Sequence, residues 1–349
     1  MFLLKLCLLK IARFCLFLLK PEASHNVAIK LLRLNLVPSL IKTTKAELSD
    51  KQNLLSNPLA YIKKYPIGLA AGFDKNADCI KNLAKLGFDY LELGTCTPLP
   101  QSGNPKPRLF RLLKQNSIIN RFGFNSKGAD YFVANLQKAM QIKNRPLIGA
   151  NIGKNKDSTS ITDDYLLMMQ KVYPCCDYIT INISSPNTKG LRDIQQEQAL
   201  EILLESVSKQ NTRLSMMHGF TRPIFLKIAP DITKEQIIYI SALCIKYKID
   251  AIIAANTTIR RDFAPLQNSK HKNFTSQQGG LSGALLNEQS LNILCLFAKE
   301  LKGKLPIISS GGIFTKEQVK QRLDCGAIGV QIYSAFIFKG PELIAKLKS

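Results

Sequence analysis

The chain has 349 residues, 46% of them hydrophobic, which is enough for one large α/β barrel or two ordinary domains and argues against a disordered protein. Its net charge of +23 fits a nucleic-acid partner, an anionic membrane surface, an anionic ligand or merely a lysine-rich composition. The nine cysteines form no C-x-x-C pair and have no neighbouring histidine, so we expect reduced, mostly buried thiols and no bound metal.

The first forty residues predict two amphipathic helices. Residues 1–19 are very apolar, and the four cations in or beside this run fall within an arc of about 140° on a helical wheel: Lys5, Lys10, Arg13 and Lys20. This pattern favours a helix at a membrane interface over a spanning helix, which needs about 20 apolar residues with few charges. The pattern also favours an interfacial helix over a secretory signal, because no cleavage site follows. Pro21 ends the helix, and a second amphipathic run extends from His25 to about Leu36.

From residue 67 onward, short β-branched runs alternate with helical patterns. Strands are predicted at residues 67–71, 89–94, 146–151, 178–183, 224–228, 251–255, 306–309 and 328–332. Helices are predicted near residues 77–86, 126–141, 163–172, 196–210, 233–248, 287–301, 315–324 and 335–348. Eight β/α units of this spacing predict an α/β fold, a (β/α)8 TIM barrel with an N-terminal amphipathic helical extension. An open, doubly wound sheet is the structural alternative.

Three local patterns add detail to this barrel. Two helices begin with the same capping box, Thr233 with Gln236 and Thr315 with Gln318. Residues 107–121 alternate around a turn and predict an inserted hairpin near the barrel mouth. The long polar stretch 258–282 is either a lid or a flexible loop.

Polar residues and glycines gather directly after the predicted strands, at the end of a barrel where catalysis takes place. Each one alone is an ordinary turn residue, but together they predict a ligand site. Lys227 lies within an apolar strand and should point into the barrel, where it needs an anionic partner. The glycine pair Gly311–Gly312 is typical of a phosphate site. The amides suit a small planar molecule such as a pyrimidine: Asn120, Asn182, Asn187 and Asn256.

Eight runs of the chain together resemble one enzyme family. They are GLAAGFDK (68–75), GTCTPLPQSGNPKPRLFRL (94–112), NRFGFN (120–125), NIGKNK (151–156), INISSPNTKGLR (181–192), KIAPD (227–231), GGLSG (279–283) and QIYSAFIFKGP (331–341). In this order and spacing the chain resembles the class 2, quinone-linked dihydroorotate dehydrogenases over nearly its whole length, the N-terminal extension included.

The resemblance implies an FMN-dependent oxidoreductase that oxidises (S)-dihydroorotate to orotate and passes the electrons to a membrane quinone, in de novo pyrimidine (UMP) biosynthesis. It implies FMN contacts at Ala71, Gly72, Phe73, Asp74, Lys75, Thr95, Asn151, Asn182, Lys227, Ala255, Gly283, Gly312, Tyr333 and Ser334. It implies substrate contacts at Lys75, Asn120, Arg121, Phe122, Gly123, Phe124, Asn182, Asn187, Asn256 and Thr257. The implied quinone tunnel contains His25, Arg108 and Tyr333.

The implied catalytic group consists of Ser185, Lys75, Thr188 and Phe124. Ser185 stands where class 1 relatives have cysteine, and it would take the C5 proton while a hydride leaves C6 for the flavin. Because a free serine is too weak an acid to be an alkoxide, the proton must move on through Thr188 and water past Phe124. Lys75 would neutralise the substrate carboxylate, and Lys227 would favour the anionic reduced flavin.

The chain departs from the family pattern in a few places. The run GGLSGALL lacks the usual proline, and Ala255 stands where threonine is common. An insertion around residues 215–219 is expected to lengthen the loop before the fifth strand. None of these changes affects Ser185 or the two lysines.

Two parts are expected: residues 1–40 as a membrane-associating helical hairpin with the quinone tunnel, and residues 41–349 as the FMN-binding barrel. We expect a monomer at an anionic membrane surface, on the cytoplasmic face of a bacterial inner membrane or on a mitochondrial inner membrane. One rival function is a tRNA dihydrouridine synthase, but such enzymes use a cysteine where this chain has Ser185 and carry an RNA-binding domain for which no residues remain. The other is a non-enzymatic, membrane-bound barrel, which Lys75, Ser185 and Lys227 disfavour. No nucleic-acid partner is expected.

Overall fold

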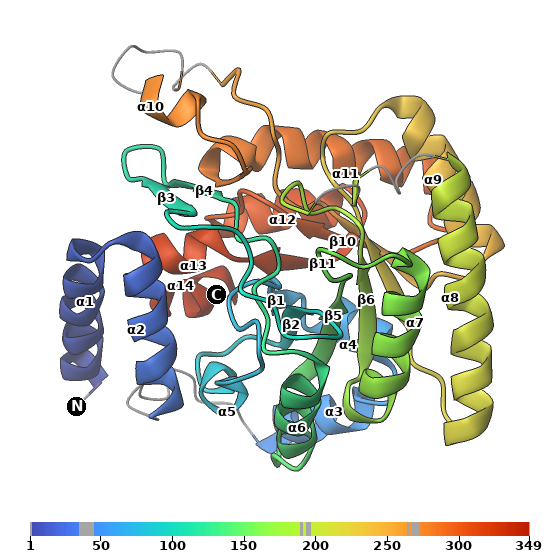
Figure 1. The fold of residues 1–349 in the computed structure, drawn as a ribbon. Helices are drawn as coiled ribbons and strands as arrows, with labels where there is room; N and C mark the ends of the chain where they lie inside the picture. Colours follow the sequence, from blue (N-terminus) through green and yellow to red (C-terminus); the bar gives the residue numbers. More distant parts are fainter. Residues whose placement is uncertain are drawn as a thin grey trace.

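A closed barrel of eight parallel strands forms the centre of the protein (Figure 1). The structure is a computed structural model that describes residues 2–34, 45–188, 191–192, 197–263, 266 and 272–348. Around the barrel, the strands follow the order β1-β11-β10-β8-β7-β6-β5-β2. Their bounds are β1 Ile67–Leu69, β2 Tyr90–Cys96, β5 Leu147–Ile152, β6 Tyr178–Asn182, β7 Ile224–Lys227, β8 Ala251–Ala254, β10 Ile307–Ser310 and β11 Ala327–Ile332. The eight predicted strands and the barrel are confirmed, and the open-sheet alternative is wrong.

Helices cover the outside of the barrel (Figure 1). They are α5 Ile80–Ala84, α6 Ala129–Met140, α7 Ile161–Val172, α8 Glu197–His218, α9 Lys234–Lys246, α11 Asn287–Leu301, α12 Lys316–Asp324, α13 Ser334–Lys339 and α14 Glu342–Lys348, with short 3-10 turns at Tyr173–Cys175 and Ala284–Leu286. A further short helix, α10 (Lys272–Thr275), lies apart from this layer, at the top of the view in Figure 1. Both predicted capping boxes are present, at the starts of α9 and α12. The insertion at residues 215–219 mostly extends α8, which runs to His218, rather than lengthening a loop.

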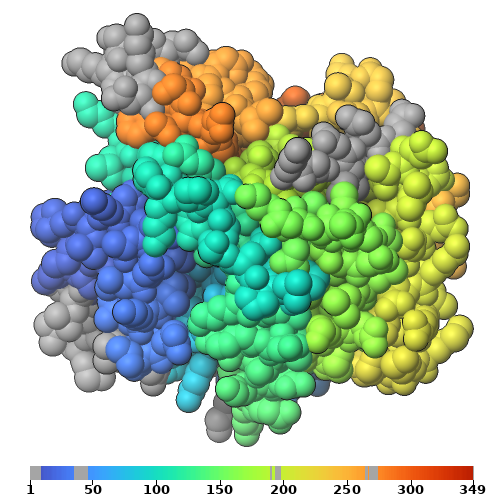
Figure 2. All heavy atoms as spheres, viewed as in Figure 1, coloured from blue at the N-terminus to red at the C-terminus, as the bar shows by residue number. Residues whose placement is uncertain are grey.

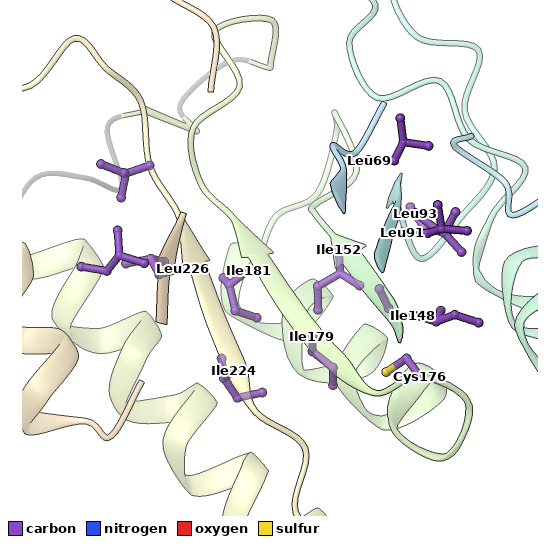
Figure 3. Close-up of a cluster of buried hydrophobic side chains, with 14 of the residues drawn as sticks. Leu69, Leu91, Leu93, Ile148, Ile152, Cys176, Ile179, Ile181, Ile224 and Leu226 are labelled. Carbon is purple, nitrogen blue, oxygen red and sulfur yellow. The ribbon is translucent and has the colours of Figure 1, made fainter. Parts of the chain in front are cut away.

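The apolar core lies on both sides of the strands. Side chains that point outward pack against the helices, among them Leu91, Leu93, Ile148, Ile179 and Ile181 (Figure 3). Inside the barrel, the N-terminal ends of the strands supply an apolar layer: Tyr90, Leu147, Tyr178, Phe225, Ile253 and Ile308. Helix α4 (Pro58–Lys64) closes this layer with Tyr61 and Ile62, next to α3 (Lys45–Leu54). Neither helix was predicted. Within the described residues, this layer fills the lower end of the barrel, and the opposite end is where barrel enzymes bind their ligands.

A small antiparallel sheet lies beside the barrel mouth. Strands β3 (Leu109–Leu112) and β4 (Ser117–Asn120) form the predicted hairpin, which is therefore confirmed. Strand β9 (Gly280–Gly283) pairs with β4 and belongs to the stretch that was predicted to be a lid or a loop. Residues 264–265 and 267–271 of that stretch lie outside the described residues.

The N-terminal residues form two helices, α1 (Phe2–Leu18) and α2 (Pro21–Arg33), that contact each other at one edge of the molecule beside the β3–β4 hairpin (Figures 1 and 2). The second helix begins at Pro21 instead of His25, because proline is well tolerated at the first helical position. Its predicted end near Leu36 lies outside the described residues. On α1, the exposed large apolar side chains include Ile11, Phe14 and Leu18. Among the described helices, none combines the length and apolarity needed to cross a membrane.

One cysteine pair differs from the expectation that all thiols are reduced. Cys295 of α11 and Cys325, which follows α12, form a disulfide with a Cα–Cα distance of 5.8 Å. Five further cysteines are free and buried, as expected: Cys79, Cys96, Cys175, Cys176 and Cys244.

Candidate active site

A cavity opens at the C-terminal ends of the barrel strands, with an empty volume of about 1010 Å³ that includes part of the solvent at its mouth. Most of the predicted cofactor, substrate and catalytic residues line it: Ala71, Gly72, Lys75, Thr95, Asn120, Phe122, Gly123, Phe124, Asn182, Ser185, Asn187, Lys227, Ala255, Asn256, Thr257, Gly283, Gly312, Tyr333 and Ser334. The barrel topology explains this convergence, because parallel strands bring their C-terminal loops to one end.

Some predicted residues lie outside the cavity lining. Asp74 turns away from it and accepts hydrogen bonds from the backbone N–H groups of Asp78 and Cys79, both at 2.8 Å, so it holds the shape of the loop. Burial raises the pKa of the Asp74 carboxyl. Arg121 donates to Gln277 Oε1 at 2.9 Å and to the carbonyl of Pro107 at 2.8 Å.

Three other predicted residues support the site from behind. Asn151 lies beneath Thr95 and Asn182, and its Oδ1 accepts hydrogen bonds from both. Thr188 is buried, and its hydroxyl has no hydrogen-bond partner among the described residues. Phe73 lines a second cavity instead of the first.

A buried ion pair lies inside the barrel at the floor of the cavity. Glu92 of β2 is 0% exposed, and its Oε1 lies 2.9 Å from Lys227 Nζ. Glu92 also accepts hydrogen bonds from Asn151 Nδ2 at 2.8 Å, Thr180 Oγ1 at 3.2 Å and Gln331 Nε2 at 2.6 Å. The anionic partner predicted for Lys227 is therefore Glu92. Sequence reasoning missed Glu92, although a glutamate inside an otherwise apolar strand was a usable signal.

Lys75 is a half-buried cation at the cavity wall. Its Nζ lies 3.6 Å from the centre of the Phe122 ring, and the Arg108 guanidinium lies 5.4 Å from the centre of the same ring. Burial, followed by the positive charge of Arg108, lowers the pKa of Lys75 to about 7, and the charges of Glu22 and Asp74 oppose this shift. An ammonium group that is this poorly solvated gains strongly from an incoming carboxylate.

Hydrogen bonds between loops hold the amides at the cavity mouth. Asn187 Nδ2 donates to the backbone carbonyl of Asn120 at 3.2 Å, and Asn256 Nδ2 donates to Ser184 Oγ at 2.9 Å. Ser185 lines the same cavity from the loop after β6, where its Oγ accepts a hydrogen bond from the backbone N–H of Asn187 at 3.3 Å. The arrangement presents donors, acceptors and one hydroxyl to a small polar ligand.

The turn after β10 offers backbone donors at the other end of the cavity. The N–H groups of Gly311, Gly312 and Ile313 donate to no acceptor within the described part of the chain, and all three residues line the cavity. Gly312 has a φ of +71°, and a Cβ there would lie 2.4 Å from the backbone of Asn287. Only glycine fits this position, and the free N–H groups are suited to an anion.

A second, mostly apolar cavity separates the N-terminal helices from the barrel. Leu9, Leu16, Leu32, Phe336 and other apolar side chains line it together with His25 and Tyr333. Tyr333 also lines the first cavity. The ring of Phe73 lies 5.6 Å from that of His25 and 6.4 Å from that of Tyr333, measured between centroids. Burial and the charge of Lys75 lower the pKa of His25 to about 3, so this imidazole is neutral near pH 7.

Arg108, which was predicted in the tunnel, lies between the two cavities without lining either. Its Nη2 lies 2.8 Å from Glu22 Oε1 of α2, and its Nη1 donates to the carbonyls of Ser102 at 2.6 Å and Asn104 at 3.0 Å. This ion pair joins the N-terminal helices to the loop that leads to the β3–β4 hairpin. Arg111 lines the second cavity in its place.

Known proteins share both the sequence and this fold. The sequence model of the dihydroorotate dehydrogenase family matches residues 59–349. A dihydroorotate dehydrogenase (quinone) of Actinobacillus pleuropneumoniae serotype 5b is 45% identical over 343 residues, which is 96% of each chain, and one of Pectobacterium atrosepticum is 44% identical over 334 residues, with 94% and 95% covered. The crystal structure of DHODH from Eimeria tenella in complex with ferulenol has a TM-score of 0.83 and 35% identity, covering 94% of this chain and 90% of that one. The chain therefore belongs to the dihydroorotate dehydrogenase family.

Proposed function

We propose that this protein is an FMN-dependent dihydroorotate dehydrogenase that oxidises dihydroorotate to orotate and transfers the electrons to a quinone. One observation carries the proposal. Lys75, Ser185 and the amides converge on one polar cavity, while an apolar cavity lies behind Tyr333 and Phe73. The two half-reactions need a polar site for an anionic pyrimidine and an apolar site for a quinone. The relatives are named for the same reaction.

The first cavity fits a flavin mononucleotide. The unpaired N–H groups of Gly311, Gly312 and Ile313 suit its phosphate, as do the hydroxyls of Ser282 and Ser334, which lie 2.9 Å apart. Lys227 at the cavity floor suits the pyrimidine edge of the flavin, where negative charge develops on reduction. When bound, FMN supplies the hydride acceptor of the reaction and passes the electrons to the quinone.

Ser185 removes the C5 proton of dihydroorotate in this proposal. The side chain lines the cavity but is only 5% exposed, so bulk water does not compete for the proton. A serine hydroxyl must hand its own proton on in order to act as a base. Thr188 in the same loop has a buried hydroxyl without a partner among the described residues, which supports a role as the next carrier. Phe124 lines the cavity and limits access of solvent to this path.

Lys75 and the amides bind the substrate and fix its orientation. The Lys75 ammonium pairs with the substrate carboxylate, which relieves the poor solvation of both charges. Asn120, Asn187 and Asn256 bind the amide edges of the ring. With the ring held in this way, C5 faces Ser185, and the chain supplies position as well as acid–base chemistry.

The second cavity takes the quinone from the membrane in this proposal. Neutral His25 offers one hydrogen-bonding nitrogen at its inner end, beside Phe73 and Tyr333. Outside, the α1 side chains of Ile11, Phe14 and Leu18 are 55%, 66% and 73% exposed, which fits immersion in acyl chains.

Residues 1–40 would then be the membrane-associating part and residues 41–349 the catalytic barrel. Because the four cations of the first twenty residues suit anionic headgroups, we place the protein on the cytoplasmic face of a bacterial inner membrane, or on the mitochondrial inner membrane if the source is eukaryotic. We propose that it is a monomer there.

Replacement of Ser185 by alanine tests the proposal directly. Ser185→Ala should keep its flavin spectrum and bind orotate, but the bleaching of the flavin by dihydroorotate in anaerobic stopped flow should slow by at least about 100-fold. Ser206→Ala, on the outer side of α8, is the matched control and should bleach like the wild type. Unchanged bleaching in Ser185→Ala would remove Ser185 from the mechanism, and a colourless wild-type protein would remove the flavin.

A further inference from the structure

Arg322 of α12 is a fully buried cation without an acidic partner among the described residues. It is 0% exposed and is the largest of the fully buried side chains. Its guanidinium donates to neutral oxygens only: Nη2 to the carbonyl of Asn287 at 2.7 Å and to Ser290 Oγ at 3.0 Å, and Nη1 to Ser309 Oγ at 3.4 Å. Its Nε has no partner in the described structure.

Two other strongly buried cations of the described chain have carboxylates at hydrogen-bond distance. Lys227 pairs with Glu92 at 2.9 Å, and Arg145 pairs with Asp177 through both terminal nitrogens. A buried charge is very unfavourable unless an opposite charge lies close by. Burial lowers the pKa of Arg322 only to about 10, so it stays charged near pH 7. The charge of Arg322 therefore points to an anion that the described residues do not supply.

The Gly311–Gly312 turn separates Arg322 from the active-site cavity. The carbonyl of Gly311 accepts hydrogen bonds from Ser290 Oγ at 2.7 Å and from Arg322 Nη2 at 3.4 Å, and the carbonyl of Gly312 accepts one from Asn287 Nδ2 at 2.8 Å. Both carbonyls are therefore held on the side of α11 and α12. The N–H groups of the turn are left free, and the turn itself lines the cavity.

We infer that Arg322 is a positioning residue for the flavin phosphate: it supplies the buried countercharge behind the Gly311–Gly312 turn and keeps the turn's N–H groups directed at the phosphate. This inference rests on the proposed function, because it requires the phosphate end of FMN at this turn. The phosphate then balances a positive charge that has no other anionic neighbour in the described structure.

A purely structural role makes a different prediction. An arginine that only ties α11, α12 and β10 together would support every ligand of the cavity equally. A countercharge discriminates between FMN and riboflavin, which has the same ring system but no phosphate. The comparison of these two ligands therefore isolates the charge effect from any general loosening of the site.

The experiment uses full-length protein from which the flavin has been removed reversibly, titrated with FMN and with riboflavin by fluorescence quenching. In Arg322→Gln, the affinity for FMN should fall by about tenfold or more, as expected for the loss of a charge-assisted interaction, while the affinity for riboflavin should change by less than about twofold. Arg322→Lys, which keeps the charge, should retain most of the preference for FMN. Equal losses for both flavins, or no loss for either, would overturn the inference.

A measurement on the wild type covers the case in which Arg322→Gln does not fold. As the pH falls, the phosphate of free FMN changes from the dianion to the monoanion near pH 6, and a buried countercharge must hold it dianionic to a lower pH. Phosphorus NMR of the holoprotein should show no protonation at pH 6, and titration at or above that value would contradict the countercharge. A wild-type protein that binds neither flavin overturns the proposed function together with this inference, whereas equal losses in the variant overturn the inference alone.

Discussion

Replacement of Lys227 by methionine should strongly destabilise the fold, because it leaves Glu92 inside the barrel without a cation. The pair is 2.9 Å apart, and Glu92 is 0% exposed. The folded variant has two options at pH 7. It can keep a buried carboxylate that only Asn151, Thr180 and Gln331 stabilise, or it can protonate Glu92. Holding an ordinary glutamic acid protonated at pH 7 costs about 3.7 kcal/mol, which sets the upper limit of the penalty. We therefore expect a loss of about 3–3.7 kcal/mol, at the lower end of the range known for broken buried pairs.

The pH dependence of this loss gives a sharp test. At pH 5 the same protonation costs only about 1 kcal/mol, so the difference in unfolding free energy between wild type and Lys227→Met should shrink by about 2–3 kcal/mol. Urea denaturation at both pH values measures it. The double variant Lys227→Met with Glu92→Gln is the matched control and should recover most of the stability at pH 7. A loss below about 1 kcal/mol in the single variant, or no recovery in the double variant, would refute the reasoning.

Three further predictions concern the ligand, the membrane and the barrel. Lys75 loses its charge as the pH rises through about 7, so orotate should bind more weakly at higher pH. Calorimetry should show a dissociation constant that increases above pH 7, and a constant that does not change between pH 6 and 9 would contradict the role of Lys75. The double variant Phe14→Glu with Leu18→Glu should sediment much less with anionic vesicles, while dihydroorotate should still reduce its flavin as in the wild type. Full vesicle binding by this variant would show that this face of α1 does not bind the membrane. Gly149→Ala places a Cβ 2.1 Å from Tyr178 Cζ, so it should lower the unfolding free energy by about 1–3 kcal/mol or more, as measured by urea denaturation. Wild-type stability would show that the Tyr178 ring moves aside freely.

The barrel was predictable because each of its strands is buried on both faces and therefore appears as a short β-branched run. The helices α3 and α4 were not predictable from the sequence. Helix α3 (KAELSDKQNL) has almost no apolar face, and its position depends on the closed bottom of the barrel. The predicted last helix is broken between α13 and α14, because Gly340 has a φ of +78° and Pro341 follows. Strand β9 pairs with β4, more than 150 residues earlier in the chain, and the local sequence does not reveal this partner.

The site was predictable where its residues follow strands, and less so where they act from within or behind them. Glu92 and Gln331 lie inside strands, and reading only the strand ends overlooks them. The ion pair of Arg108 with Glu22 could not be predicted from the sequence, because the two residues are 86 positions apart and belong to different parts of the fold. The functional roles carried over from the family remain predictions that the experiments above test.

The wall that Tyr333 and Phe73 form between the two cavities has a kinetic consequence. If the two cavities hold the pyrimidine and the quinone as proposed, each reactant enters by its own opening, and orotate can leave before or after the quinone arrives without either blocking the other. Initial-rate plots at several fixed quinone concentrations should therefore give parallel double-reciprocal lines, and orotate should inhibit competitively against dihydroorotate alone.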